Sequence, residues 1–224
     1  MGTYQVTYAL EAYRRYAENE NPLYDLTDLE NEDPNEPRQE LPYKDVKEGD
    51  WFYDYVYDVY IKKLMTGLDT DVFGPDRNLV RAQFAVILYR MEGEPEVIFK
   101  ETFPDVADGL FYSKAVIWAA ENKIVTGYTS TGAFGSNDPI TREQMAVMMF
   151  RYANYKGLDT SESKELSSFP DDEKVQEFAV GALQWCAAKE IITGKGEEKA
   201  LAPQGSTNRA ECATIISRYT GIAE

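Results

Sequence analysis

The chain has 224 residues, 43% of them hydrophobic, and its 39 acidic and 23 basic residues give a formal net charge of −16. The apolar content suffices for a folded core, whereas a face that binds nucleic acid needs clustered Lys and Arg, which argues against that class of partner. No run of about 18 apolar residues occurs, so no segment is predicted to span a membrane.

The N-terminal residues 1–42 predict a short helix followed by an acidic linker. Periodic Tyr, Leu and Ala side chains in TYQVTYALEAYRRYAENE favour the helix, as the end of a preceding domain or as a segment docked on the main body. Residues 18–40 carry nine acidic residues and one basic residue, Arg38, a composition typical of a solvated linker. No hydrophobic signal segment follows Met1 and Gly2, which predicts an artificial start or a cut fragment.

Three segments then repeat one another, at residues 43–95, 96–160 and 161–224. An aspartate opens each repeat, a glycine follows a first predicted helix, and an arginine begins a second: Asp45, Asp105 and Asp171; Gly67, Gly127 and Gly194; Arg81, Arg142 and Arg209. Successive glycines lie 60 and 67 residues apart, and successive arginines 61 and 67. Near-equal steps for independent landmarks indicate a repeat architecture.

Each repeat is expected to fold as a helix, a loop and a second helix. The first helix has apolar residues four apart: Trp51, Tyr55 and Val59; Phe111, Ala115 and Ala119; Phe178, Ala182 and Cys186. A Thr-Gly pair is expected to end it, because glycine takes the left-handed conformation. The second helix repeats at i, i+3, i+4 and i+7: Phe84, Ile87, Leu88 and Met91; Met145, Met148, Met149 and Tyr152; Cys212, Ile215, Ile216 and Tyr219. Three stacked units could bury both stripes in an all-α core.

The residue types in the sequence give little support for a catalytic site or a metal site. The chain has no histidine, which excludes Ser-His-Asp and Cys-His nucleophiles and a histidine-ligated zinc site. Cys186 and Cys212 lack metal-ligand spacing and are either small core residues or a disulfide pair. No pattern isolates a pair of catalytic carboxylates among the many acids. We therefore expect no enzyme activity, no metal and no cofactor.

The start of the second helix in the middle repeat places a cation where a helix disfavours one. Thr141 predicts an N-cap and Gln144 completes a capping box, yet Arg142 lies in the first turn, which costs up to about 1 kcal/mol against the helix dipole. A bound anion would offset this cost, because unpaired helix N–H groups and a guanidinium both favour a carboxylate. Alternatively, Arg142 could cover an aromatic ring or pair with a carboxylate such as Asp105.

These motifs resemble the surface-layer homology domain family. The turns read LMTGLD, IVTGYT and IITGKG, the helix starts read LVRAQ, ITREQ and TNRAE, and the resemblance covers about residues 43–221. It implies an all-α fold of three helix-loop-helix repeats packed as a pseudo-threefold helical spindle. It also implies grooves between repeats that bind secondary cell-wall polysaccharide, often pyruvylated, and so anchor a larger exported protein on a Gram-positive envelope.

The resemblance implies ligand-binding residues at the motif positions: Arg81, Arg142, Arg209, Thr141, Asn208, Gly67, Gly127, Gly194 and Tyr128. The middle repeat keeps the most complete set, whereas Lys195 replaces the turn aromatic in the third repeat and Val80 replaces the cap in the first. Sequence does not fix whether an arginine works with its own turn or with a neighbour's. Most aromatics of the loops are expected in the core, with Tyr128 the best candidate for sugar contact among Tyr128, Phe134, Phe73 and Trp51.

The functional prediction is a monomeric, non-catalytic wall anchor at the bacterial cell surface, with positive potential confined to the grooves. Its partner would be cell-wall polysaccharide, not nucleic acid, without insertion into a membrane. The alternative is a protein-binding adhesin or a module for S-layer self-assembly, in which exposed aromatics or the acidic segment would contact another protein.

Overall fold

The computed structural model describes residues 39–223. Its helices are α2 (Tyr53–Ile61), α3 (Arg81–Met91), α4 (Ser113–Glu121), α5 (Arg142–Tyr155), α6 (Val180–Ala188) and α7 (Arg209–Ala223), with 3-10 turns η2 (Leu166–Ser168), η3 (Asp172–Lys174) and η4 (Glu177–Ala179). The described part contains no β-strand, which confirms the all-α class. None of its helices is both long and apolar enough to cross a membrane. The predicted N-terminal helix lies outside the described residues.

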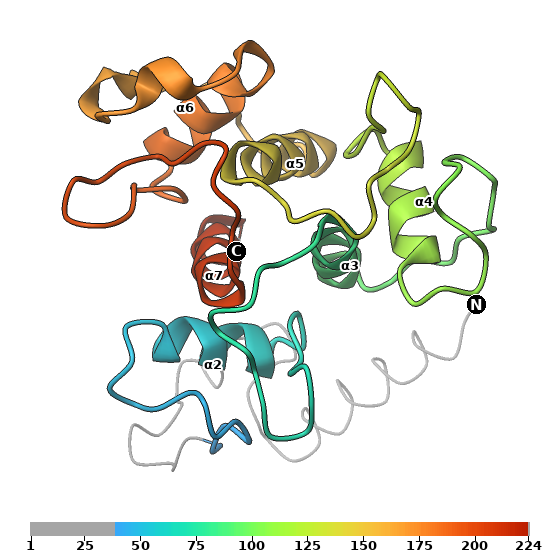
Figure 1. Ribbon diagram of the computed structural model, residues 1–224, viewed down its shortest axis with the longest axis horizontal. Coiled ribbons are helices and arrows are strands. Elements are labelled where there is room, and N and C mark those ends of the chain that lie inside the picture. The colour runs from blue at the N-terminus through green and yellow to red at the C-terminus, as the bar shows by residue number, and fades with distance from the viewer. Residues whose placement is uncertain (1–38, 224) are drawn as a thin grey trace, which may run out of the picture. The chain divides into compact units, whose positions relative to one another are not determined.

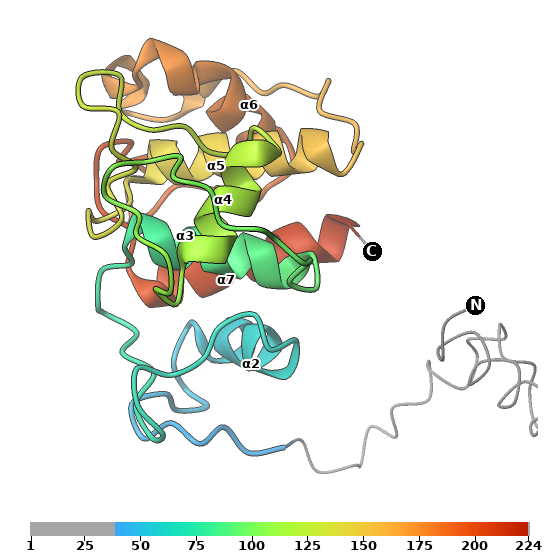
Figure 2. The same cartoon turned by 90° about the vertical axis from the view of Figure 1, so that its right-hand side faces the viewer.

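The helices pack across the boundaries between repeats. The first helix of each repeat contacts the second helix of another, so that α4 packs on α3, α6 on α5 and α2 on α7. Figure 1 shows α3, α5 and α7 at the centre, with α2, α4 and α6 around them. In the view turned by 90°, α2 and α6 lie on opposite sides of the central helices and α4 crosses in front of them (Figure 2). Each repeat therefore completes its core with its neighbour.

Three backbone hydrogen bonds join the repeats in a closed ring just before the central helices begin. The N–H of Leu79 donates to the carbonyl of Thr207, that of Ile140 to Leu79, and that of Thr207 to Ile140, at 2.9, 2.9 and 3.0 Å. The three positions are equivalent in the sequence repeat. Because each residue donates to one neighbour and accepts from the other, the bonds fix all three helix starts together.

The opening aspartates anchor the loop between the two helices of their own repeat. Asp105 accepts backbone N–H bonds from Phe134, Gly135 and Ser136 at 2.6, 2.8 and 3.0 Å. The other two repeats do the same, since Asp45 accepts from Phe73 and Gly74, and Asp171 from Leu201 and Ala202. A carboxylate that accepts several N–H groups gives an irregular loop one defined conformation.

The prediction that the Thr-Gly pairs end the first helices is wrong. These helices end at Ile61, Glu121 and Ala188. The left-handed residue that closes each is a Lys or Glu two positions later: Lys63, Lys123 and Glu190, with φ of 57°, 60° and 56°. The N–H after each bonds back to the helix, as in a Schellman motif. Gly127 instead allows two backbone segments to lie close together, because a Cβ at this position would lie 2.8 Å from the carbonyl oxygen of Gly132.

The first-helix stripe is only partly buried. Its leading aromatics Trp51, Phe111 and Phe178 were expected in the core, but they precede the helices and are 63%, 75% and 57% exposed. Tyr55 is half-buried. The remaining stripe positions are buried as predicted: Val59, Ala115, Ala119, Ala182 and Cys186. The second-helix stripes are also buried, apart from half-buried Met91.

The two cysteines are free thiols in the core. Both are fully buried, which confirms the core-residue alternative over the disulfide. Burial raises the pKa of the Cys212 thiol to about 12 and raises that of Cys186 as well. Both therefore stay protonated and unreactive at neutral pH.

The loop anchor predicts a pH-dependent contribution to stability from Asp105. Burial acts to raise its pKa, but N–H bonds from Ser136, Phe134 and Gly135 outweigh burial and bring the pKa below 3.8. Because the pKa of this carboxyl is lower in the folded than in the unfolded state, its ionised form stabilises the fold at pH values above the unfolded-state pKa. This stabilisation is lost as the pH falls through the folded-state pKa. Asp105→Asn should cost about 1 kcal/mol at pH 7, a low value because the carboxylate is partly solvated.

Urea denaturation of the wild type and Asp105→Asn between pH 7 and about pH 2 measures this contribution. The two unfolding free energies should converge at the acidic end. A constant difference over the whole range would contradict the assigned role of the carboxylate.

Candidate functional site

Three surface grooves lie at equivalent places between the repeats. We name them A, B and C, after the repeat whose second helix forms the wall. Groove A is lined by Leu64–Leu68, α3 and Phe111; groove B by Val125–Thr129, α5 and Phe178; groove C by Ile191–Gly196, α7 and Trp51. Their volumes are about 160, 330 and 440 Å³. Each groove thus contains the Thr-Gly turn of one repeat and an exposed aromatic ring of another.

The helical wall of each groove uses the same four positions. In groove A these are Gln83, Val86, Ile87 and Arg90. The equivalents are Gln144, Val147, Met148 and Arg151 in groove B, and Glu211, Thr214, Ile215 and Arg218 in groove C. The spacing i, i+3, i+4 and i+7 places them along one face of the helix. The two middle positions are apolar in grooves A and B and are Thr214 and Ile215 in groove C, and every face ends in an arginine.

The motif arginines enter these grooves from the preceding repeat. Arg209 lines groove A, Arg81 groove B and Arg142 groove C. Sequence left open whether Arg142 works with its own turn or with a neighbour's; in the structure it lines groove C with Gly194, whereas Tyr128 lines groove B. The three arginines are only 4 to 6% exposed. Each guanidinium therefore belongs to the floor of a groove that the next repeat builds.

Hydrogen bonds to loop carbonyls hold these arginines in place. The Nε–H groups of Arg81, Arg142 and Arg209 donate to the carbonyls of Phe134, Leu201 and Phe73 at 2.9, 2.7 and 2.7 Å. Nη2 of Arg81 also reaches the carbonyl of Thr126 at 3.3 Å, and Nη2 of Arg209 that of Thr66 at 2.5 Å. Every bond crosses from one repeat to the next. The arginines therefore join the repeats as well as line the grooves.

Aromatic rings and burial define the electrostatics of the guanidinium groups. The guanidinium of Arg81 lies 5.0 Å from the ring centre of Tyr128 and 4.8 Å from that of Phe134. Arg209 lies 4.5 Å from the Phe73 ring. Desolvation lowers the pKa of all three motif arginines, yet a guanidinium stays charged at neutral pH. The grooves therefore hold permanent, poorly hydrated cations.

The helix starts do not offer the free N–H groups that the sequence suggested. In α5 the N–H of Arg142 donates to Gly205 and that of Glu143 to Pro203, both at 3.0 Å. The first two N–H groups of α3 and α7 likewise donate to loop carbonyls of a neighbouring repeat. The expectation of an anion site made by unpaired helix N–H groups is therefore wrong. The alternative pairing of Arg142 with Asp105 is also not formed, because Asp105 anchors its own loop.

The remaining sequence-predicted site residues divide into caps and groove residues. Thr141 and Asn208 cap their helices by accepting the N–H of Gln144 and of Glu211, at 3.3 and 2.8 Å, whereas Val80 gives no side-chain cap, as expected. These cap positions are not among the groove-lining residues. The turn glycines and Tyr128 do line grooves: Gly67 in A, Gly127 and Tyr128 in B, and Gly194 in C.

Sequence reasoning missed two features of the grooves. The first is the second arginine, Arg90, Arg151 or Arg218, which lies nine residues after the motif arginine in every repeat. That constant spacing was a usable signal. The second is the exposure of Phe111 and Phe178, which periodicity had placed in the core, whereas their equivalent Trp51 was already a candidate for sugar contact. Of the four aromatics considered for sugar contact, Phe73 and Phe134 are fully buried, while Trp51 and Tyr128 reach the grooves.

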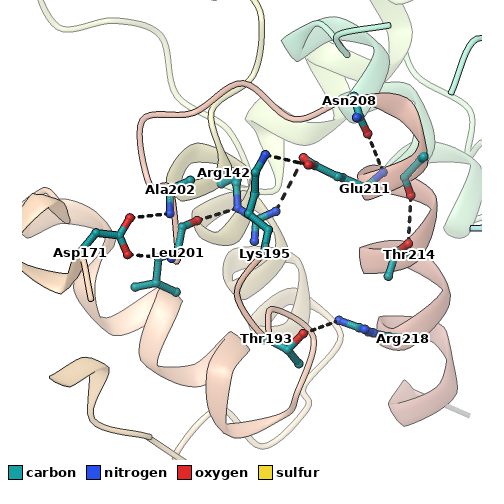
Figure 3. A network of polar contacts seen from close by, with 11 residues as sticks. Arg142, Asp171, Thr193, Lys195, Leu201, Ala202, Asn208, Glu211, Thr214 and Arg218 are labelled. Atoms are coloured by element: carbon teal, nitrogen blue, oxygen red, sulfur yellow. Dashed lines mark hydrogen bonds and ion pairs between the residues drawn. The ribbon is translucent and has the colours of Figure 1, made fainter. Parts of the chain in front are cut away.

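Groove C differs from the other two in its charged residues (Figure 3). Glu211 stands where grooves A and B have a glutamine, and Lys195 follows the turn glycine. Nζ of Lys195 bonds Oε1 of Glu211 at 2.7 Å, and Oε2 of Glu211 lies 3.8 Å from Nη1 of Arg142. At the far end, Nη1 of Arg218 donates to Oγ1 of Thr193 at 3.1 Å. Groove C therefore contains an internal carboxylate between two of its cations.

Comparison with known families matches the S-layer homology domain at residues 42–85, 102–146 and 168–213, more than half of the chain. The three matched ranges follow the three structural repeats.

The chain is also similar to parts of longer proteins. It is 32% identical over 177 residues to an endoglucanase of Bacillus sp. (strain KSM-635), which covers 79% of this chain and 18% of that protein. It is 27% identical over 158 residues to a cellulosome-anchoring protein of Acetivibrio thermocellus, which covers 69% of this chain and 34% of that protein. It is 28% identical over 122 residues to a surface-layer 125 kDa protein of Lysinibacillus sphaericus, which covers 52% of this chain and 10% of that protein. The chain thus spans 34% or less of each relative.

The arginine contacts between repeats predict a stability loss on Arg209→Lys. Lysine keeps the charge but lacks the planar fork that reaches both Phe73 and Thr66. The loss of these buried bonds should lower the unfolding free energy by about 1–3 kcal/mol, measured by urea denaturation. Arg77→Lys is the matched control, because Arg77 is exposed and should change stability by less than about 0.5 kcal/mol. Equal effects of the two substitutions would show that the cross-repeat bonds do not stabilise the fold.

Proposed function

Because this chain belongs to the S-layer homology domain family, we propose that it anchors a larger protein by binding an acidic cell-wall polysaccharide in grooves A, B and C. Family membership and the matched surface proteins indicate a location at the cell surface or cell wall. Cell-surface anchoring is the role common to the family. The polymer, its pyruvyl group and the use of the grooves are our proposals.

The observation that carries this proposal is the repetition of one set of groups in all three grooves. Each groove joins a buried arginine, a second arginine at the helix end, a Thr-Gly turn, an apolar wall and an exposed aromatic ring. The buried arginine and the aromatic come from repeats other than the one that forms the wall. A pocket with apolar walls and few convergent polar groups is typical of a ligand site.

The chemistry of the set suits an acidic sugar. A guanidinium grips a carboxylate, such as that of a pyruvate ketal, through parallel charge-assisted hydrogen bonds. A pyranose ring can lie on an aromatic face, which Trp51, Phe111 and Phe178 present to the grooves. The turn glycines add backbone next to the arginine without a side chain in the way. One repeating unit would therefore contact parts of all three repeats.

The net charge of −16 does not oppose an anionic ligand at the scale of a groove. Grooves A and B each include two arginines and no Asp or Glu among their lining residues. Groove C includes two arginines and two lysines against Glu211. Glu94 pairs with Arg90 of groove A at 3.5 Å. At physiological salt, fields fade over about 8 Å, so the groove cations outweigh the more distant acids. The lining agrees with positive potential confined to the grooves.

Several grooves on one monomer make strong anchoring compatible with weak individual sites. Once one groove holds the polymer, a neighbouring groove meets the next repeating units at a high effective concentration. Such binding needs neither catalysis nor a metal, and we propose a purely non-catalytic role for this module. A protein-binding adhesin or self-assembly role remains the alternative, and it predicts no affinity for purified wall polymer.

Arg151→Gln tests ligand binding without disturbing the contacts between repeats. Arg151 lines groove B, and its guanidinium forms no ion pair or hydrogen bond within the described residues. Calorimetric titration with a synthetic pyruvylated wall disaccharide should detect binding to the wild type. The variant should bind the disaccharide about tenfold more weakly in groove B, with an unchanged melting temperature.

Two controls define the result of this titration. The same disaccharide without its ketal should bind more weakly to the wild type, because it lacks the carboxylate. Arg77→Gln removes an exposed charge outside the grooves and should bind as the wild type does. If the pyruvylated sugar gives no heat with the wild type, the proposed ligand is wrong, and a protein partner becomes the leading alternative.

A further inference from the structure

The three motif arginines differ in how their buried charge is compensated. Arg81 and Arg209 donate to carbonyl oxygens, and no salt bridge to either is formed within residues 39–223. The carboxylates of Asp138 and Asp105 favour the charged form of Arg81, and the carboxylate of Asp45 favours the charged form of Arg209. All three lie beyond ion-pair distance. A buried cation without a close anion is unfavourable. Grooves A and B therefore contain a charge that an anionic ligand would compensate.

Arg142 in groove C already has such an anion. Oε2 of Glu211 lies 3.8 Å from its Nη1, and Lys195 holds the other carboxylate oxygen at 2.7 Å. Figure 3 shows the carboxylate between the two cations. The Glu211 side chain is 15% exposed, and its Oε2 is buried without a hydrogen-bond donor in the described structure. Its contact with Arg142 is therefore an ion pair without a hydrogen bond.

The equivalent glutamines have a different task in grooves A and B. Oε1 of Gln83 accepts the N–H of Val80 at 3.2 Å, and Oε1 of Gln144 that of Thr141 at 3.4 Å. These side chains turn back to cap their helices and carry no charge. Glu211 instead turns toward Lys195, the residue that replaces Tyr128 of groove B. The turn lysine and the helix glutamate thus form an ion pair that grooves A and B lack.

We propose that grooves A and B are the principal sites for the acidic group of the ligand, and that Glu211 is a built-in counter-ion which weakens acidic-ligand binding in groove C. This inference rests on the proposed function. A ligand carboxylate at Arg142 would meet Glu211 at a distance where like charges repel, or would have to displace it from Lys195. We expect affinity for groove C to be about tenfold lower than for A or B.

The expected difference in affinity between groove C and grooves A and B comes from the position of Glu211, not from the total charge of the groove. Groove C is lined by four cations and one acid, so its summed charge is no less positive than that of groove A or B. Lys199 and Arg218 remain available to a polymer backbone, but Arg218 lies at the far end beside Thr193. If total charge governed binding, groove C would be the strongest site. The two explanations therefore predict opposite rankings.

A nuclear magnetic resonance titration can report on each groove separately. The Nε–H groups of Arg81, Arg142 and Arg209 are buried and hydrogen-bonded, so in nitrogen-15-labelled protein each gives its own protected signal. The probe is the synthetic pyruvylated disaccharide, with the ketal-free disaccharide as control. Arg81 and Arg209 signals should shift at about tenfold lower ligand concentration than the Arg142 signal.

A pair of reciprocal double variants tests the role of the counter-ion at constant net charge. Glu211→Gln with Lys195→Tyr gives groove C the groove B residues, and the Arg142 signal should then respond at the same concentration as Arg81. Gln144→Glu with Tyr128→Lys transplants the ion pair into groove B and should shift the Arg81 response to about tenfold higher concentration. Each variant removes or adds one acid and one base together, so a change in net charge cannot explain the result.

The outcomes separate this inference from the proposed function. If Arg142 responds together with or before the other two arginines in the wild type, the counter-ion role is wrong while anchoring through the grooves stands. If the double variants leave the order of response unchanged, the role assigned to Glu211 is also wrong. If no arginine responds and calorimetry shows no heat, the proposed ligand itself fails.

Discussion

The bond from a buried arginine to a loop carbonyl of the next repeat is the interaction on which this structure depends. Arg81 bonds the second repeat, Arg142 the third, and Arg209 returns to the first, so the three bonds close a ring. No repeat can leave the ring without losing a bond on each side. The backbone bonds among Leu79, Ile140 and Thr207 follow the same order. In the folded state each repeat is therefore bonded to both others.

The same arginines explain why grooves form at the boundaries between repeats. A guanidinium that reaches across a boundary places its charge where two repeats meet, and the turn glycine leaves space beside it. Carbonyl oxygens use only some of its donors, since a guanidinium has five N–H groups. The arginine side chains are also among the residues that line the grooves. Cohesion between repeats and the capacity to bind an anion thus come from one side chain, which accounts for a cation at the start of a helix.

Repetition made the fold class and the helix pairs predictable, but not how the repeats connect. Equal spacing of Asp105 and Arg142 with their equivalents gave the units, and period 3.6 gave the buried faces of the second helices. Spacing within one repeat contains no information about its neighbour. The sequence could therefore not show that Arg142 works with the turn at Gly194 rather than Gly127. Exposed Phe111 was misassigned because an aromatic four residues before a buried helical position, Ala115, fits the same pattern.

Differences among the repeats carry information that their similarity does not. A ring of three identical repeats would give three identical grooves, each with a buried charge to compensate. Here the third repeat has Glu211 and Lys195 at two of these positions, and Nζ of Lys195 bonds Oε1 of Glu211 at 2.7 Å. An internal carboxylate stabilises the arginine of that boundary whether or not ligand is present. One boundary can then secure the ring permanently while the other two keep charges that only a ligand compensates, so stability and affinity need not compete at the same site.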